Sequence, residues 1–266
     1  MQSDYWSKQT SSRPLFPDLL WSRPENRNQA GKLLIVGGNP HSFAAVAEAY
    51  AAAAKAGVGT ARVLLPDSLQ KTVGKVLMEG EYAPTTPSGS FSQKALSELL
   101  AMSQWADGVL LAGDLGRNSE TAILLEKFIE KYSGQLTITK DAIDYFKALP
   151  HVLDRPETSL VLSFAQLQKL ATSARFTQAI TFDMDLLRLV DWLHEFTLPH
   201  SATIITKHLE NIFVAVNGQV SSTKLEPDME IWRVKTAASA SVWWLQNPSK
   251  AFEASTSAII TSTTGE

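Results

Sequence analysis

The residues of this chain that could do chemistry lie at the ends of apolar runs, where strands are expected to stop. Residues 113–117 read Gly-Asp-Leu-Gly-Arg and follow an apolar run. Gly113 and Gly116 would let the backbone wrap around a ligand, although the same residues are also typical of a tight turn between a strand and a helix. Asp114 would repel an anionic ligand unless a neighbouring group neutralises its charge.

Two further charged residues have similar positions. Lys207 directly follows the apolar run 203–206, so its ammonium group could reach a phosphate from the edge of a sheet; the alternative is a solvated surface lysine. Asp141 begins a helix after a strand over 135–139. A carboxylate there favours the helix dipole and accepts hydrogen bonds from free N–H groups. We therefore expect Asp141 to cap its own helix.

The elements that must position these residues are clearest at 31–66. An apolar strand over 33–36 leads into Gly37 and Gly38, then a long alanine-rich helix, then a second strand over 60–65. Short apolar runs around a helix-length segment indicate a βαβ unit in a parallel sheet. Glycines after the first strand permit close approach of a ligand, and the helix N-terminus offers N–H groups to an anion. The pattern predicts a nucleotide or phosphorylated ligand.

The same alternation continues along the chain. It predicts strands over 108–112, 135–139, 159–162, 203–206 and 212–216, and helices over 120–132, from 141, from 164, within 186–196, over 234–246 and over 248–260. Asn217-Gly218 predicts a hairpin turn, and we expect Trp243 and Trp244 to pack in the core or at a subunit contact. We expect an extended arm over residues 1–30 and one α/β domain over 31–266.

Composition excludes several classes of function. The chain has 266 residues, a net charge of −3 and no cysteine, which removes disulfides and thiolate chemistry. No Lys/Arg cluster marks a predicted element, so we expect no nucleic-acid partner. The five histidines lack metal-ligand spacing, so we expect no metal site. No stretch approaches the ~20 apolar residues of a membrane span, and no signal peptide is evident. We expect no membrane partner and a cytoplasmic location.

Together these segments resemble the ADP/ATP-dependent NAD(P)H-hydrate dehydratases over most of residues 31–255. Gly37-Gly38 resembles the first-strand glycine turn of that family, and the helix ending at 51–59 places Ala45 on the alanine of its Gly-Ala-Pro motif. Residues 110–117 are similar to its Gly-Pro-Gly-Leu-Gly-Arg loop. Residues 202–220 are similar to its Lys-Gly strand pair, with Lys207 on the lysine.

The resemblance implies a three-layer α/β/α, ribokinase-like domain with a central, mostly parallel sheet. It implies ADP or ATP as a ligand, Mg²⁺ as a candidate ion, and a homo-oligomer. It also implies roles for single residues: substrate binding for Ala45 and Gly116, nucleotide binding for Lys207, and further site positions at Gly38, Gly113 and Asp141.

The chain departs from the family where the chemistry should lie. The Asp-Ala-Asp-Ala-Leu strand end of the family reads Thr-Lys-Asp-Ala-Ile at 139–143, and its histidine- and glutamate-containing loop after strand 159–162 reads SFAQLQKL. The Gly-Thr-Gly-Asp signature is expected at 232–241, where the chain reads WRVKTAASAS. Without that aspartate, a proton transfer worth roughly 10²–10⁴ in rate is missing. We therefore assign no catalytic residue.

Three functions stay open. The favoured one is a relative of NAD(P)H-hydrate dehydratases that is non-catalytic or weakly active and retains part of a nucleotide or NAD(P)H pocket. The second is an active enzyme, either a dehydratase with displaced residues or a small-molecule kinase. The third is a structural or partner-binding protein that uses the aromatic arm and the Trp243-Trp244 helix.

Overall fold

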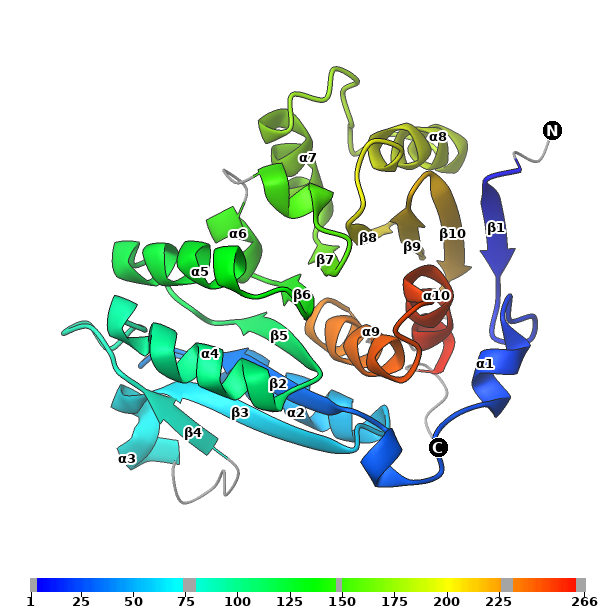
Figure 1. The fold of residues 1–266 in the computed structure, drawn as a ribbon. Coiled ribbons are helices and arrows are strands. Elements are labelled where there is room, and N and C mark those ends of the chain that lie inside the picture. Colours follow the sequence, from blue (N-terminus) through cyan, green and yellow to red (C-terminus); the bar gives the residue numbers. More distant parts are fainter. Residues whose placement is uncertain (1–3, 74–79, 147–149, 226–231, 262–266) are drawn as a thin grey trace.

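The computed structural model describes residues 4–73, 80–146, 150–225 and 232–261. The strands within these residues form one ten-stranded sheet of order β1-β10-β9-β8-β7-β6-β5-β2-β3-β4 (Figure 1). The strands are β1 Trp6–Gln9, β2 Lys32–Gly37, β3 Thr60–Pro66, β4 Gly80–Ala83, β5 Gly108–Gly113, β6 Gln135–Thr139, β7 Thr158–Leu162, β8 Thr203–His208, β9 Asn211–Val216 and β10 Gln219–Lys224.

Seven neighbouring strands, from β8 to β4, run parallel, whereas β9 is antiparallel to both β8 and β10. The central strands are buried on both faces, as is typical of a parallel sheet between two layers of helices. The mostly parallel α/β architecture predicted from the sequence is confirmed. Because parallel strands end at the same edge, the loops that follow β2, β5, β6 and β7 lie close together.

Helices cover both faces of the sheet (Figure 1). Buried side chains of α2, α9 and α10 pack on one face, and those of α4 to α8 pack on the other. The helices are α1 Pro17–Trp21, α2 Ala44–Lys55, α3 Gln70–Val73, α4 Leu96–Trp105, α5 Ser119–Lys131, α6 Ala142–Phe146, α7 Phe164–Ser173, α8 Leu186–Thr197, α9 Val234–Gln246 and α10 Ala251–Thr261. None of these described helices has the length and apolar character needed to cross a membrane.

Helix α9 has an orientation that matters for the site. Its C-terminal residues Trp244 and Leu245 lie beside Gly108 and Gln135, where β5 and β6 begin. Its N-terminus therefore lies near the opposite edge of the sheet, where those strands end. Trp243 and Trp244 are 0% and 2% exposed, so the expected core packing of this pair is confirmed.

The expected N-terminal arm contributes to the sheet. Strand β1 pairs in parallel with β10, and buried Trp6 donates a hydrogen bond from Nε1 to Ser222 Oγ (3.0 Å). Leu19 of α1 is also buried, whereas Trp21 is 88% exposed. The hairpin turn predicted at Asn217 is present, with φ of +48° there. Neither β1 nor the edge strand β4 was predicted from the sequence.

Candidate functional site

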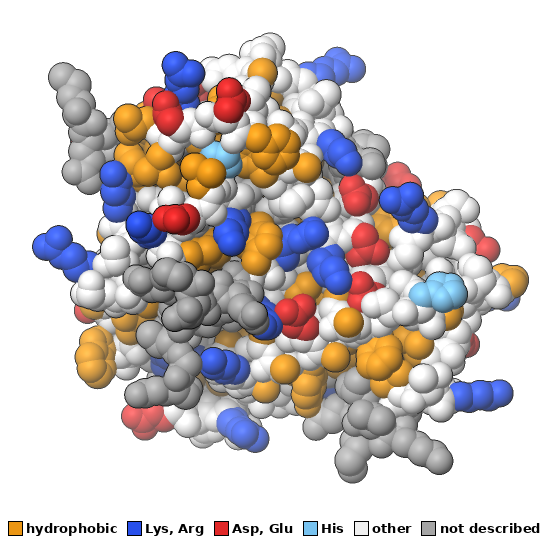
Figure 2. Space-filling view, turned by 180° about the vertical axis from the view of Figure 1, so that it is seen from behind, with side chains coloured by type: hydrophobic (Ala, Val, Ile, Leu, Met, Phe, Trp, Pro, Cys, Tyr) orange, Lys and Arg blue, Asp and Glu red, His pale blue; other side chains and the backbone are white. Residues whose placement is uncertain are grey.

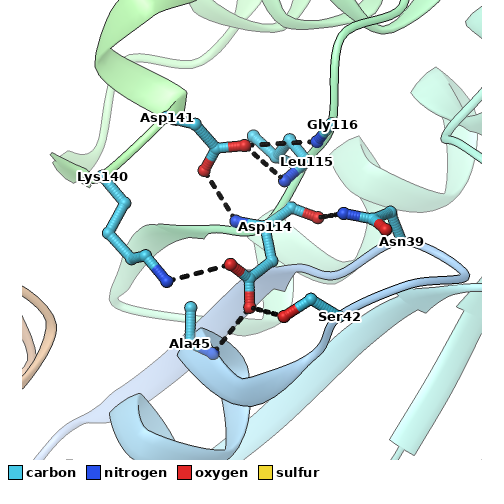
Figure 3. A network of polar contacts seen from close by, with 8 residues as sticks. All are labelled: Asn39, Ser42, Ala45, Asp114, Leu115, Gly116, Lys140 and Asp141. Atoms are coloured by element: carbon cyan, nitrogen blue, oxygen red, sulfur yellow. Dashed lines mark hydrogen bonds and ion pairs between the residues drawn. The ribbon is translucent and has the colours of Figure 1, made fainter.

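The loop after β5 and the residue after β6 meet at the carboxyl edge of the sheet (Figure 3). Asp141 Oδ1 accepts a hydrogen bond from the Asp114 N–H (2.7 Å). Its Oδ2 accepts from the N–H groups of Leu115 (2.9 Å) and Gly116 (3.2 Å). The expectation that this carboxylate caps its own helix is therefore wrong. Among the described residues, the N–H groups that donate to its side chain belong to the loop after β5 and not to α6.

The glycine at 113 is required by this contact. Gly113 has φ of +103°, and a Cβ atom there would lie 2.6 Å from Lys140 Cβ and 2.7 Å from Asp141 Oδ1. Such distances are incompatible with any side chain at position 113 unless the backbone moves. The sequence allowed two interpretations of this loop, a backbone that wraps around a ligand and a tight turn. The structure shows a tight turn whose N–H groups face a carboxylate of the same chain.

Asp114 has its own set of partners. Its Oδ1 lies 2.9 Å from Lys140 Nζ, and its Oδ2 accepts hydrogen bonds from Ser42 Oγ (2.8 Å) and from the Ala45 N–H at the start of α2 (2.8 Å) (Figure 3). Burial opposes ionisation of this side chain, which is 11% exposed, but the bonds from Ala45, Lys140 and Ser42 outweigh it and lower the pKa of Asp114. The carboxylate that the sequence marked as repulsive to an anion is thus neutralised internally.

The glycine turn after β2 is joined to the same loop. The Gly38 N–H donates to the Gly113 carbonyl (3.0 Å), and Asn39 Nδ2 donates to the Asp114 carbonyl (2.6 Å). A Cβ atom at Gly37 would collide with the Gly113 carbonyl oxygen, so the pair of glycines permits close contact between β2 and β5. These contacts join the two loops into one unit.

A cavity of ≈370 Å³ opens beside this unit. It brings together residues that follow β5, β6 and β7, residues of α6 and α7, and the N-cap residue of α9. They are Asp114, Lys140, Asp141, Asp144, Ser163, Ala165, Gln166, Lys169 and Arg233. A second depression of ≈230 Å³ shares Asp141 and Asp144 with the cavity and is also lined by Gly116, Arg117 and Tyr145.

Three charged residues of the cavity have a positive φ angle, which is uncommon for residues other than glycine. Asp114, Lys140 and Arg233 have φ of +56°, +52° and +58°. This conformation costs roughly 1–3 kcal/mol for each residue other than glycine. The surrounding contacts must hold these residues in place, as the network around Asp114 does for the first two.

The sequence-predicted residues divide into two groups. Gly38, Gly113, Gly116 and Asp141 meet in the network, and Ala45 joins it through its N–H while its side chain is fully buried. Lys207 is half-buried in β8 and is not among the described residues that line the cavity.

Sequence reasoning missed Lys140, Lys169 and Arg233 as residues of the site. Lys140 carried a usable signal, because it stands next to Asp141 and replaces an aspartate of the resembled family. Lys169 and Arg233 lie in the segments 163–170 and 232–241, which correspond to motifs of the resembled family, but neither residue type matches those motifs. No group of three or more His, Cys, Asp or Glu side chains in the described part of the chain is arranged to hold a metal ion.

Known proteins share the fold of this chain, and one of them shares part of its sequence. No protein-family model matches the chain. The bifunctional NAD(P)H-hydrate repair enzyme Nnr of Moorella thermoacetica is 29% identical over 138 residues, which are 50% of this chain and 26% of that protein. A ribokinase-like superfamily protein of Enterococcus faecalis superposes with a TM-score of 0.71 at 15% identity, over 98% of this chain and 88% of its own.

The chain has a ribokinase-like fold. Within this fold, the ADP/ATP-dependent NAD(P)H-hydrate dehydratase of Bacillus subtilis, crystallised with ATP and Mg²⁺, superposes with a TM-score of 0.61 at 10% identity, over 94% of this chain and 87% of its own. The resemblance to NAD(P)H-hydrate dehydratases indicated by the sequence is confirmed. The chain spans about a quarter of the length of the curated repair enzyme, so that enzyme's activity is not transferred by the match alone.

Proposed function

We propose that this ribokinase-like protein binds a nucleotide of the ADP, ATP or NAD(P)H kind at the carboxyl edge of its sheet and catalyses NAD(P)H-hydrate dehydration weakly or not at all. Support for binding comes from the ≈370 Å³ cavity lined by three cationic side chains, and from the dehydratase of the same fold that was crystallised with ATP and Mg²⁺. The cations suit phosphate groups, whereas the described residues offer no evident cluster of ligands for Mg²⁺ itself.

One observation carries the catalytic part of the proposal: the carboxylates at this edge are already engaged. Asp114 is held by Lys140 and by the start of α2, and Asp141 accepts three backbone N–H groups. The lowered pKa of Asp114 makes that carboxyl group a poor proton donor near neutral pH. The segment 232–241, where the family carries its acid/base aspartate, has no carboxylate in this chain.

Ligand titration tests the binding proposal. Thermal unfolding is measured with ADP, ATP, NADH and NADPH at up to millimolar concentration, because a ligand that binds only the folded state stabilises it by about 2.7 kcal/mol at 100 times its Kd. We expect a rise in Tm with at least one of the four. No rise with any of them would overturn nucleotide binding.

A repair assay tests the catalytic part. Hydrated NADH is incubated with the protein and ADP or ATP, and the recovery of NADH absorbance is followed. We expect a rate close to background. Robust turnover that disappears in both Lys207→Ala and Asp141→Ala would overturn this part of the proposal and support an active dehydratase. Turnover that survives both changes would point to a contaminating enzyme or to a different site.

The alternative that the protein acts mainly by binding partners relied on the aromatic arm and on the Trp243-Trp244 helix. Trp243 and Trp244 are buried within the chain, whereas Trp21 of the arm is 88% exposed and stays a candidate contact. A homo-oligomer stays a prediction, and light scattering of the purified protein tests it.

A further inference from the structure

Helix α8 is amphipathic, and its outer face carries apolar side chains as well as charged ones. Its inner face packs on β9 and β10 through six buried residues, among them Trp192 and Phe196. Leu187 near its start and Leu198 at its C-cap are 56% and 58% exposed. Large apolar side chains that gather on one surface mark a contact with another molecule, whereas single ones scattered over a surface do not.

The same surface continues past the start of α8. The loop before the helix is joined to the tip of the β8–β9 hairpin, since His208 Nε2 lies 2.9 Å from the Met184 carbonyl oxygen. Phe182 of this loop and Leu209 of the tip are 62% and 69% exposed. Leu209 also has φ of +52°, which costs free energy for a leucine.

Four of the six large apolar side chains that are exposed in the described residues therefore belong to α8, to its C-cap or to the segments beside its start. In Figure 2, hydrophobic side chains gather at the upper left of the face shown, with basic and acidic side chains beside them. This concentration on one part of the surface indicates an interface.

Two exposed residues of opposite charge, Arg188 and Glu195, lie along the outer face of α8. Arg188 is 3.8 Å from Asp185 in an exposed pair of the kind that contributes little to stability, and Glu195 accepts a hydrogen bond from the neutral amide of Gln178. An α-helix turns by about 100° per residue, which places Arg188 and Glu195 about 20° apart around its axis. The two exposed leucines are also about 20° apart. The face therefore has an apolar edge beside a charged edge, with a cation near the helix start and an anion near the helix end.

This arrangement is complementary to itself. Two antiparallel helices related by a two-fold axis bring the start of one helix against the end of the other, and each edge of one helix meets the same edge of its partner. The apolar edge then pairs Leu187 with Leu198 of the partner subunit. The charged edge pairs Arg188 with Glu195 of the partner subunit, and the axis repeats both contacts. A second copy of the chain thus supplies the matching pattern of charge.

Asp191 is the remaining charged residue between the two leucines. It accepts a hydrogen bond from the Tyr5 hydroxyl (2.6 Å), and the Tyr5 ring stacks on His194 at a centroid distance of 3.7 Å. The carboxylate is therefore drawn towards Tyr5 at the edge of the outer face, which limits its repulsion of the same residue in a second copy.

We propose that α8 is the centre of an isologous dimer contact, in which a second copy of the chain packs antiparallel on Leu187, Arg188, Glu195 and Leu198. The exposed apolar residues beside the start of α8 extend the contact at each end. This inference is independent of nucleotide binding, because none of the described residues of α8 lines the cavity at the carboxyl edge.

Charge reversal of the pair between subunits tests this contact. The molar mass of the full chain is measured by light scattering and by sedimentation over a wide range of protein concentration. We expect the wild type to form a dimer. Arg188→Glu and Glu195→Arg should each weaken it by at least about tenfold, because each change places like charges opposite one another twice. Glu126→Arg, which reverses an exposed carboxylate on α5, is the matched control and should dimerise as the wild type does.

An equal mixture of the Arg188→Glu and Glu195→Arg proteins separates this contact from an effect on folding. In a dimer with one chain of each kind, both charged pairs again join opposite charges. We therefore expect the mixture to dimerise nearly as well as the wild type, although neither protein does so alone.

The opposite outcomes are equally definite. A wild type that stays monomeric at every concentration overturns the proposal, and so does a dimer that both charge reversals leave unchanged. A mixture of the two variants that stays monomeric overturns the pairing of Arg188 with Glu195 of the partner subunit. Leu187→Ser and Leu198→Ser remove the apolar edge, and wild-type association in both would place the contact elsewhere.

Discussion

Replacing Asp141 by asparagine tests the central contact of the site. Asparagine is as good as aspartate at capping a helix through one oxygen. In this structure, however, both carboxylate oxygens accept, Oδ1 from the Asp114 N–H and Oδ2 from the N–H groups of Leu115 and Gly116. In either orientation of the amide, its NH₂ group therefore faces at least one N–H donor. Asparagine cannot substitute here, although it would substitute in a cap.

The magnitude follows from the number and charge of these bonds. Hydrogen bonds to a charged group contribute roughly 1.5–3 kcal/mol each, and breaking a buried charged contact costs about 3–5 kcal/mol in total. Asp141 is half-buried, and water can replace part of what is lost. We therefore expect Asp141→Ala to lower the free energy of unfolding by about 3 kcal/mol, and Asp141→Asn to lower it by about 2 kcal/mol or more.

Urea unfolding, followed by tryptophan fluorescence and circular dichroism, measures both variants. Glu126→Gln removes an exposed carboxylate from α5 and should change the free energy of unfolding by less than about 0.5 kcal/mol. If Asp141→Asn is as stable as that control, the three hydrogen bonds contribute little and Asp141 acts as an ordinary helix cap.

Three other residues give predictions of stability. The pKa of Asp114 lies below its ordinary value of 3.8, so its contribution is present above pH 3.8 and is lost as the pH falls through the folded pKa; the stability difference between wild type and Asp114→Asn should shrink over that fall in urea titrations. Burial raises the pKa of Tyr132 to about 12, so the protein should lose stability as the pH rises from about 10 to 12, less steeply in Tyr132→Phe, with tyrosinate absorbance as the readout. Trp243→Ala should lower the free energy of unfolding by about 3–5 kcal/mol, whereas the same change at exposed Trp21 should cost less than about 0.5 kcal/mol in urea unfolding.

Most of the fold was predictable because its central strands are continuous apolar runs. The predicted bounds of 135–139 and 234–246 coincide with β6 and α9. The edge strands were not predictable in the same way. Strand β4 has only four residues, and β1 exists because Trp6 packs beside β10, a long-range contact that no local pattern reveals.

The site was predictable only where backbone geometry determines the residue type. Glycines at 38, 113 and 116 mark the loops, because these positions have positive φ. The partners of Asp114 and Asp141 were not predictable, since a carboxylate at a helix start has a local explanation that hides its tertiary one. Arg233 was likewise hidden, because only the orientation of α9 brings it to the edge where β6 and β7 end.

The residues at 114 and 140 compensate each other, because the carboxylate of one and the ammonium group of the other form an ion pair. Lys140 replaces an aspartate of the resembled family, and Asp114 falls in the middle of its Gly-Pro-Gly-Leu-Gly-Arg loop. Either change alone would leave an unpaired charge at the start of α2, whereas together they form a 2.9 Å ion pair that also satisfies the Ala45 N–H. A stable structure requires such compensation, because an unpaired buried charge is costly. The pair therefore accounts for an ordered edge of the site, in which the charge of each side chain is balanced by the other.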